Sequence, residues 1–313
     1  MSGLGITIDA RDLVRDFGTK KAPVHAVRGL SLEVRRGELF GLVGPDAGGK
    51  TTTMRMIAGL VRPTSGMVRV LGEDPWKGAQ KVRDALGLMP QEHSLYGDLS
   101  IEENMQFFSK LFCLSRAQYR ERRERLLSIT RLGAFTARRA DALSGGMYKK
   151  LALMCALLHQ PEVLLMDEPT NGVDPVSRRE LWELIYELVD QGMTVLVSTP
   201  YMDEASRCHR VALVHQGRVL SEGDPNVLVR DLECPTAEVV GGDREAVHTI
   251  LASLPEVLAS SPAGAQLRVV IAPGASDRVA GAVRVAGASL APAQPAFEDV
   301  FLAKVALAER QAA

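Results

Sequence analysis

The feature that most constrains this chain is a glycine-rich segment that fits the pattern G-x-x-x-x-G-K-[ST]. It consists of Gly44, Pro45, Asp46, Ala47, Gly48, Gly49, Lys50, Thr51 and Thr52. The apolar residues 39–43 before it predict a buried strand, and residues 53–60 after it predict a helix that stops at a glycine. A loop between a strand and a helix is the setting in which this pattern binds phosphate, because glycines let successive backbone N–H groups turn toward one anion.

Two side chains of this loop would act on a bound nucleotide. Lys50 would reach the β- and γ-phosphates, and the Thr51 hydroxyl would bind Mg²⁺. The alternative is an ordinary glycine-rich turn, and composition alone produces such a match in a chain of this length with odds on the order of one in a hundred. The predicted strand and helix on either side weaken that alternative further.

Composition sets the broad class of protein. The chain has 313 residues, enough for one large α/β domain and a small one, and 46% of them are hydrophobic. The net charge of −1 gives no basic surface, so no nucleic acid is expected as a partner. The scattered cysteines favour reduced thiols in a cytosolic protein over disulfides or zinc. Neither a signal peptide nor a run of the ~18 apolar residues of a membrane span is present, so any membrane role is expected to run through a partner.

The first part of the chain predicts a small antiparallel sheet. Apolar side chains alternate along residues 5–36, and the polar segment 18–23 predicts a turn. Phe17 lies at that turn, where it either caps the sheet or stacks on a nucleotide base, and the spacing alone favours the cap. Residues 64–72 predict a turn and another strand, and the apolar segment 82–88 leads to Gln91.

Residues 92–145 predict a helical insertion in the α/β domain. Ser100, followed by Glu102 and Glu103, is typical of a helix start. The segment 116–125 is rich in arginine but mixed in sign. A solvated helix face is therefore favoured over a nucleic-acid patch.

The segment after this insertion predicts an exposed helix N-terminus. Ser144 is placed as the N-cap of the helix that it opens, predicted over residues 148–159. Gly145 and Gly146 leave the N-terminal amides of that helix open, and such amides bind anions.

Two carboxylates follow at the end of an apolar run. Residues 163–166 lead directly into Asp167 and Glu168, as in a central parallel strand that is buried on both faces. Because ligands bind at the carboxyl ends of parallel strands, these two side chains are expected beside the phosphate loop. A helix over 178–189, a buried strand at 194–198 and a hairpin over 211–220 complete the domain.

Beyond residue 225 the composition changes to one rich in Ala, Val, Ser and Pro. The order of predicted elements is βαββαβ followed by a tail helix, which is a ferredoxin-like arrangement. The strands are expected at 237–240, 256–260, 267–271 and 289–293, and the helices at 243–253, 276–285 and 297–309.

Five motifs in order carry a resemblance to a known family: the phosphate loop, Gln91, Leu143-Ser144-Gly145-Gly146, the strand ending in Asp167-Glu168, and Asn171-Gly172-Val173-Asp174. Over residues 5–225 the chain resembles the nucleotide-binding subunit of an ATP-binding cassette (ABC) transporter. The resemblance implies an α/β fold with a P-loop NTPase core, an antiparallel β-subdomain and a helical insertion. The expected domains are 1–225, including the helical subdomain 92–145, and a C-terminal α+β domain over 226–313.

The resemblance also implies site roles in binding and hydrolysing ATP with Mg²⁺. Phe17 corresponds to the aromatic residue that stacks on adenine, and residues 44–52 form the Walker A loop. Gln91 corresponds to the glutamine that senses Mg²⁺ and the attacking water. Asp167 would hold Mg²⁺ through water, and Glu168 would be the general base.

The family works as a dimer, so the resemblance implies partners. Ser144, Gly145 and Gly146 correspond to the signature that closes on ATP held by the opposite subunit, and Asp174 to a residue that connects the two sites. The expected partners are a second cassette, identical or different, and a membrane permease, with this chain peripheral on the cytoplasmic face of the membrane. The C-terminal part resembles the extension of many exporter ATPases, which typically ends in a motif like 297–302.

Two departures from the family pattern bear on activity. The loop has Ala47 and Gly48 where the family usually has the two residues in the opposite order, a change expected to be tolerated if position 47 does not need a positive φ. Pro200 stands where the family has a histidine that contacts the γ-phosphate, and proline has no proton to donate. His209 and His215 are expected to be surface or packing residues.

Three interpretations remain open from the sequence. The chain is one of two unequal ATPase subunits of an exporter, with a slow site of its own; the run from Ser198 to Ala205 resembles the first cassette of fused, duplicated exporter ATPases. Alternatively, it is an ordinary homodimeric exporter ATPase in which Glu168 suffices. The third is a soluble ABC protein acting on ribosomes or DNA, which usually has two cassettes or a long coiled coil.

Overall fold

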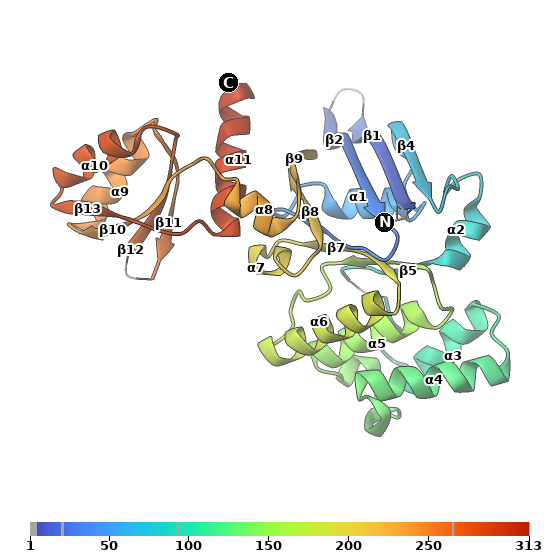
Figure 1. Cartoon of the computed structure of the whole chain (residues 1–313). Helices are drawn as coiled ribbons and strands as arrows, with labels where there is room; N and C mark the ends of the chain where they lie inside the picture. The colour runs from blue at the N-terminus through green and yellow to red at the C-terminus, as the bar shows by residue number, and fades with distance from the viewer. Residues whose placement is uncertain (1–4, 20–21, 93, 265, 313) are drawn as a thin grey trace.

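A mostly parallel six-stranded sheet forms the centre of the molecule, in the order β5-β6-β7-β3-β8-β9 (Figure 1). The computed structural model describes residues 5–19, 22–92, 94–264 and 266–312. Every residue of the three central strands is buried, as expected for strands covered on both faces. The strands are β3 (Leu39–Val43), β5 (Leu86–Met89), β6 (Val163–Asp167), β7 (Thr194–Thr199), β8 (Arg210–His215) and β9 (Arg218–Gly223), and only β9 runs antiparallel to its neighbour.

The predicted antiparallel sheet at the start of the chain is confirmed, with longer strands than expected. It has the order β2-β1-β4, formed by β1 (Ile6–Thr19), β2 (Ala22–Arg35) and β4 (Ser65–Val70). Residues 20 and 21 of the predicted turn lie outside the described residues. A shared apolar core joins this sheet, the helix α1 (Lys50–Ile57) and one face of the central sheet, with Ile8, Phe40 and Met54 among its buried members.

The predicted helical insertion is confirmed and contains α3 (Ile101–Leu111) and α4 (Arg116–Thr130). Both helices begin with a capping box, formed by Ser100 with Glu103 and by Ser115 with Gln118. Ser144 caps the helix α5 (Gly145–Leu157) as predicted, and the helix begins directly after it, three residues earlier than expected. It packs with α6 (Pro175–Asp190) on the other face of the central sheet, in the largest apolar core.

The expected βαββαβ order is confirmed in residues 236–312, named here the C-terminal unit. Its four strands pair in the antiparallel order β11-β12-β10-β13, the ferredoxin-like order. Two helices pack on one face of this sheet and α11 on the other. The elements are β10 (Thr236–Gly241), α9 (Arg244–Ser253), β11 (Val257–Ala263), β12 (Gln266–Ile271), α10 (Ser276–Arg284), β13 (Ala288–Pro292) and α11 (Phe297–Ala312).

Short helices connect these parts. The dipeptide Asp224-Pro225, at the predicted domain boundary, starts the helix α8 (Pro225–Arg230), with Asp224 as N-cap and proline at the first helical position. The helices α2 (Ala79–Ala85) and α7 (Met202–Ala205) precede β5 and follow β7. None of the helices in the described part of the chain combines the length and the apolar composition that spanning a membrane requires.

Helix α11 lies between the C-terminal sheet and the central sheet (Figure 1). Ala303 packs toward the C-terminal sheet, while Phe297, Val300 and Phe301 join the core of the central sheet. A buried ion pair fixes the start of the helix, because Arg268 on β12 donates to both carboxylate oxygens of Asp299. Asp299 also accepts from the backbone N–H of Ala296 at 2.6 Å.

We expect Arg268→Met to destabilise the C-terminal unit by about 3 kcal/mol, because it leaves the carboxylate of Asp299 buried without its cation. Chemical denaturation followed by circular dichroism measures this change. The matched control is Arg278→Gln, whose arginine is 75% exposed in its ion pair with Glu256 and should change stability by about 0.5 kcal/mol or less. Equal losses in both variants would contradict the structural role of the Arg268–Asp299 pair.

Candidate functional site

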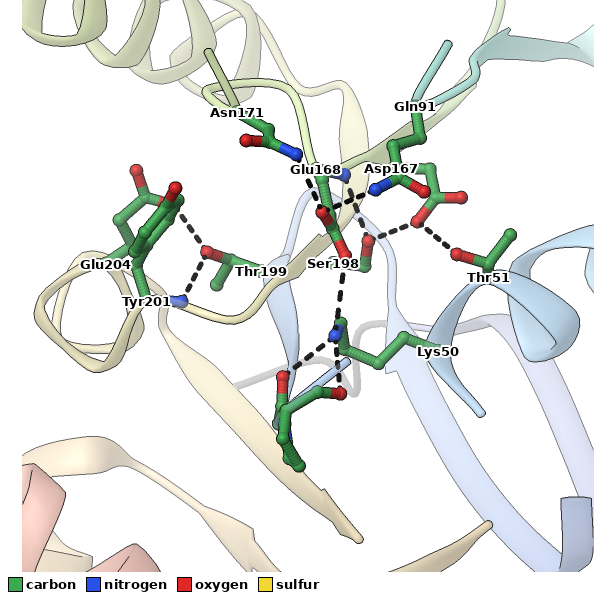
Figure 2. Close-up of polar contacts among 12 residues, drawn as sticks. Lys50, Thr51, Gln91, Asp167, Glu168, Asn171, Ser198, Thr199, Tyr201 and Glu204 are labelled. Atoms are coloured by element: carbon green, nitrogen blue, oxygen red, sulfur yellow. Dashed lines mark hydrogen bonds and ion pairs between the residues drawn. The ribbon is translucent and has the colours of Figure 1, made fainter. Parts of the chain in front are cut away.

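The carboxyl ends of β3, β6 and β7 meet at one edge of the central sheet, where Lys50, Thr51, Gln91, Asp167 and Glu168 come together (Figure 2). The phosphate loop follows β3, Asp167 ends β6, and Ser198 lies near the end of β7. Parallel pairing places Asp167 directly opposite Ser198. The sequence-based expectation that the carboxylates lie beside the phosphate loop is therefore met by the strand register.

Lys50 is the first residue of α1 and lies under the phosphate loop. Its side chain is only 3% exposed, and its Nζ donates to the backbone carbonyls of Gly44 (2.8 Å) and Pro45 (2.9 Å). The same Nζ lies 3.5 Å from Oε1 of Glu168. The loop therefore holds a buried cation that faces the carboxylate at the end of β6 (Figure 2).

Asp167 connects the phosphate loop to β7. Its Oδ1 accepts from the Thr51 hydroxyl at 3.2 Å and from the Ser198 hydroxyl. No sequence motif marks Ser198 as a site residue, although its place in a buried strand next to the carboxylate strand is a usable signal. A hydroxyl and a carboxylate at this separation are a donor set that suits Mg²⁺, which prefers few protein oxygens together with phosphate and water.

Glu168 is held from several sides. Its Oε2 accepts from the amide of Gln91 at 2.8 Å and from that of Asn171 at 3.4 Å. Its backbone N–H donates to the carbonyl and to the hydroxyl of Ser198, and its φ of +47° places it in the left-handed region. A non-glycine residue in that region is a local strain that the surrounding bonds maintain, and such strain is common at functional sites.

Lys149 on α5 also belongs to this cluster, and no sequence motif singled it out. Its Nζ donates to the backbone carbonyl of Gln91 at 2.9 Å and lies 3.5 Å from that of Glu168. Burial lowers the pKa of Lys149, while the neighbouring carboxylates of Asp167 and Glu168 oppose that shift. Lys149 therefore ties the helix that begins at Ser144 to the Gln91 segment.

The signature residues lie at the N-terminus of α5. The Ser144 hydroxyl accepts from the N–H of Met147 at 3.4 Å, which confirms it as the N-cap. A side chain at position 146 would come within 2.3 Å of Ser177, so Gly146 is required for close packing in this chain as well as for open amides. Within the described part of the chain, no hydrogen bond or ion pair joins Ser144 to the phosphate loop.

Like the signature residues, Phe17 and Asp174 have no hydrogen bond to the side chains of the cluster among the residues that the structure describes. Phe17, near the end of β1, is 38% exposed, and the guanidinium of Arg15 lies 4.5 Å above its ring. Asp174 is the N-cap of α6 and accepts from the N–H groups of Val176 and Ser177. Hydrogen bonds from Ser177 lower the pKa of Asp174.

The segment after β7, which contains Pro200, is fixed by a wholly buried carboxylate. Glu204 accepts from the hydroxyls of Thr199 (2.6 Å) and Thr170 (2.7 Å) and from the indole N–H of Trp182 (3.2 Å). Thr199 also accepts from the N–H of Tyr201 (Figure 2). These bonds hold the segment that would carry the family histidine against α6.

The two histidines have structural surroundings, as expected. His209 lies beyond the short helix α7, and its Nδ1 accepts from the backbone N–H of Leu39 at the start of β3. The ring of His215, at the end of β8, packs edge-on against Phe301.

The exchanged pair in the phosphate loop does not meet the condition under which it is expected to be tolerated. Ala47 has a φ of +59°, so position 47 does adopt the left-handed region that favours glycine. Gly48 instead lies outside that region. The side chain of Ala47 therefore adds local strain to the loop, by about 1 kcal/mol relative to glycine.

The fold and this cluster define an α/β protein that binds nucleotide phosphates at a P-loop. A family model described as "ABC transporter" matches residues 27–171. The "Nod factor export ATP-binding protein I" of Paraburkholderia xenovorans (strain LB400) is 41% identical over 232 residues, which cover 74% of this chain and 76% of that protein. The chain therefore belongs to the ATP-binding proteins of ABC transporters, a family of ATPases.

Other relatives differ in how much of their length is matched. The "Probable multidrug ABC transporter ATP-binding protein YbhF" of Escherichia coli (strain K12) is 40% identical over 88% of this chain, yet the chain spans only 48% of its length. A solved ATP-binding subunit of an ABC transporter has a TM-score of 0.63 at 29% identity and covers 72% of this chain and 92% of its own. A dimeric cassette solved with ADP and Pi has a TM-score of 0.62 at 25% identity, covering 69% of this chain and 98% of its own.

We expect Ala47→Gly to raise the free energy of unfolding by about 1 kcal/mol, because it removes the side chain from a left-handed position. Thermal and chemical unfolding of the nucleotide-free protein measure this change. The control is Ala58→Gly at the end of α1, where φ is −70° and glycine should cost about 0.5–1 kcal/mol. A loss of stability in both variants would show that the loop does not strain Ala47.

Proposed function

We propose that this chain is the ATP-binding subunit of an exporter and hydrolyses ATP at a dimer interface to drive a membrane permease. The observation that carries the proposal is the convergence of Lys50, Thr51, Gln91, Asp167 and Glu168 at one edge of the sheet. The names of the relatives, which include a multidrug and a Nod factor export ATP-binding protein, support the direction of transport.

The cluster supports a specific division of roles in hydrolysis. Lys50 and the phosphate-loop N–H groups bind the β- and γ-phosphates, and Phe17 stacks on adenine. Glu168, oriented by Gln91, accepts the proton of the water that attacks the γ-phosphorus. The bond from that phosphorus to the bridging oxygen breaks, and ADP leaves with the bridging oxygen.

Mg²⁺ would be held by the hydroxyl of Thr51, the carboxylate of Asp167 and the side-chain oxygen of Gln91. When bound, it would neutralise charge on the β- and γ-phosphates. Among the described residues, no cluster of three or more His, Cys, Asp or Glu side chains forms a metal cage. The few oxygen donors of Thr51, Asp167 and Gln91 support an ion that arrives with the nucleotide, because Mg²⁺ keeps waters and phosphate oxygens as ligands.

The dimer supplies the missing part of each site. Ser144, Gly145 and Gly146 would close on the γ-phosphate held by the opposite cassette, through the N-terminal amides of α5. Asp174, adjoining Gly146 at the start of α6, would connect the two sites. One solved relative of this fold is itself described as a dimeric cassette.

A permease would dock on an apolar cavity of about 400 Å³ beside the Gln91 segment. The cavity is lined by Leu60, Leu86, Pro90, Phe108, Phe112 and His159. Leu60 in this lining is 64% exposed. Leu111, which precedes the lining residue Phe112, is 62% exposed. A short apolar segment from the cytoplasmic side of the permease fits this lining, and it would place this chain peripherally on the cytoplasmic face of the membrane.

The division into residues 1–225 and 226–313, with the helical subdomain at 92–145, is part of this proposal. The separate sheet and apolar core of the C-terminal unit support it. Residues 1–4 and 313, at the two ends of the division, lie outside the described residues. The role of the second part is then accessory to ATP binding.

The hydrolytic site of this chain is slow because Pro200 offers no proton or hydrogen bond to the γ-phosphate. This chain would then pair with a different cassette, and its Ser144 would complete a faster site on that partner. The E. coli relative supports this pairing, because this chain spans 48% of it and leaves room for a second cassette. A homodimer remains the second candidate, favoured by the hydrogen bonds from Gln91 and Asn171 that hold Glu168.

We expect Glu168→Gln to abolish the hydrolysis that this chain performs while ATP binding persists, because the amide cannot accept the proton of the attacking water. Phosphate release and equilibrium binding of ATP measure the two effects. The control is Glu183→Gln on the exposed side of α6, where the carboxylate is 58% exposed and should change neither. Unchanged phosphate release in Glu168→Gln would exclude Glu168 as the base.

We expect Pro200→His to raise the hydrolysis rate of the isolated chain by about 100-fold, the size of effect of one well-placed hydrogen-bond donor to a transition state. The measurement is the turnover number at saturating ATP and Mg²⁺. The same rate should rise in the unmodified chain when the partner cassette is added. Full activity of the unmodified homodimer, lost in Glu168→Gln, would refute the slow-site proposal.

A further inference from the structure

The turn between β8 and β9, residues 215–217, lies directly against the phosphate loop. The N–H of Gly217 donates to the carbonyl of Gly48 at 2.9 Å, and the carbonyl of Gly217 accepts from Arg28 on β2 at 2.8 Å. A side chain at position 44 would come within 2.0 Å of the carbonyl of Val214. The backbone of β8 and its turn therefore forms one wall of the phosphate loop, with no space between them.

His215 begins this turn and directs its side chain to the C-terminal unit. Its ring packs edge-on against Phe301 of α11, with 6.3 Å between ring centroids and 76° between planes. Its Nε2 lies 3.6 Å from Oε1 of Glu309, also on α11. Within the part of the chain that the structure describes, both ring nitrogens are buried and form no hydrogen bond.

Helix α11 is anchored to both of its neighbours. Phe297, Val300 and Phe301 are embedded in the core of the central sheet, while Arg268 holds Asp299 to the C-terminal sheet. The contact at His215 is thus the place where this doubly anchored helix touches a turn that is hydrogen-bonded to the phosphate loop.

We propose that His215 is a positioning residue through which α11 and the C-terminal unit set the geometry of the phosphate loop, and with it the affinity for ATP. The path is short: α11 packs on His215, His215 belongs to the turn 215–217, and Gly217 bonds Gly48. The shape of the ring carries the effect, because its nitrogens form no hydrogen bond among the described residues and the carboxylate 3.6 Å from Nε2, that of Glu309, is 61% exposed and screened by water.

Two truncations on opposite sides of this contact test the proposal in the full-length chain. His215→Ala and Phe301→Ala should each weaken the binding of ATP about fivefold or more, the lower end of typical coupling between sites. His215→Phe should keep the affinity within about twofold, because it preserves the ring. The measurement is equilibrium binding of ATP in the presence of EDTA, which removes hydrolysis and Mg²⁺ from the readout.

Controls separate positioning from general loss of structure. Val285→Ala, on a side chain of the C-terminal unit that is 85% exposed, should bind ATP as the unmodified chain does. The double variant His215→Ala/Phe301→Ala should be no weaker than the poorer single variant, since both remove the same contact. Thermal unfolding of each variant identifies any that fail to fold, and His215→Phe then decides whether the ring is required.

The proposal is overturned if folded His215→Ala and Phe301→Ala both bind ATP with unchanged affinity. It is also overturned if their effects add fully in the double variant, because additive losses would mean independent sites. A loss of affinity in His215→Phe equal to that in His215→Ala would likewise refute it, by showing that the ring shape is not what matters.

Discussion

The parallel pairing of β3, β6 and β7 is the constraint on which the rest of the site depends. It brings three chain segments that are far apart in sequence to one edge, and it sets Asp167 opposite Ser198. Hydrogen bonds from Thr51 and Ser198 then lock Asp167 between the phosphate loop and β7. Buried carboxylates need such partners, because an unpaired charge in the interior is strongly unfavourable.

The charged side chains around this edge are held in place by several contacts each. Lys50 and Lys149 approach the carboxylate strand from opposite elements, the phosphate loop and α5. The amide of Gln91 donates to Glu168, and the backbone carbonyl of Gln91 accepts from Lys149. A shift of α5 therefore changes the surroundings of Glu168 directly, which gives a physical route between the helical insertion and the site.

Much of this arrangement could be predicted from the sequence, because its signals are local. A glycine loop after an apolar run, and carboxylates at the end of another, are sufficient to place Lys50, Asp167 and Glu168 together. The direction of the Lys149 side chain and the packing of His215 on α11 could not be predicted, since both depend on tertiary placement. The φ of Ala47 was likewise hidden, because the residue type itself argues against a left-handed conformation.

The buried carboxylate of Glu204 has one more consequence, for spectroscopy. The chain has two tryptophans, and Trp182 is wholly buried with its indole N–H bonded to Glu204. Thr199, beside Pro200, shares that carboxylate. Any displacement of the segment after β7 alters the polarity around the indole. The intrinsic emission of Trp182 is therefore a built-in optical probe of this segment. A single substitution at Trp76, the second tryptophan, separates the two signals.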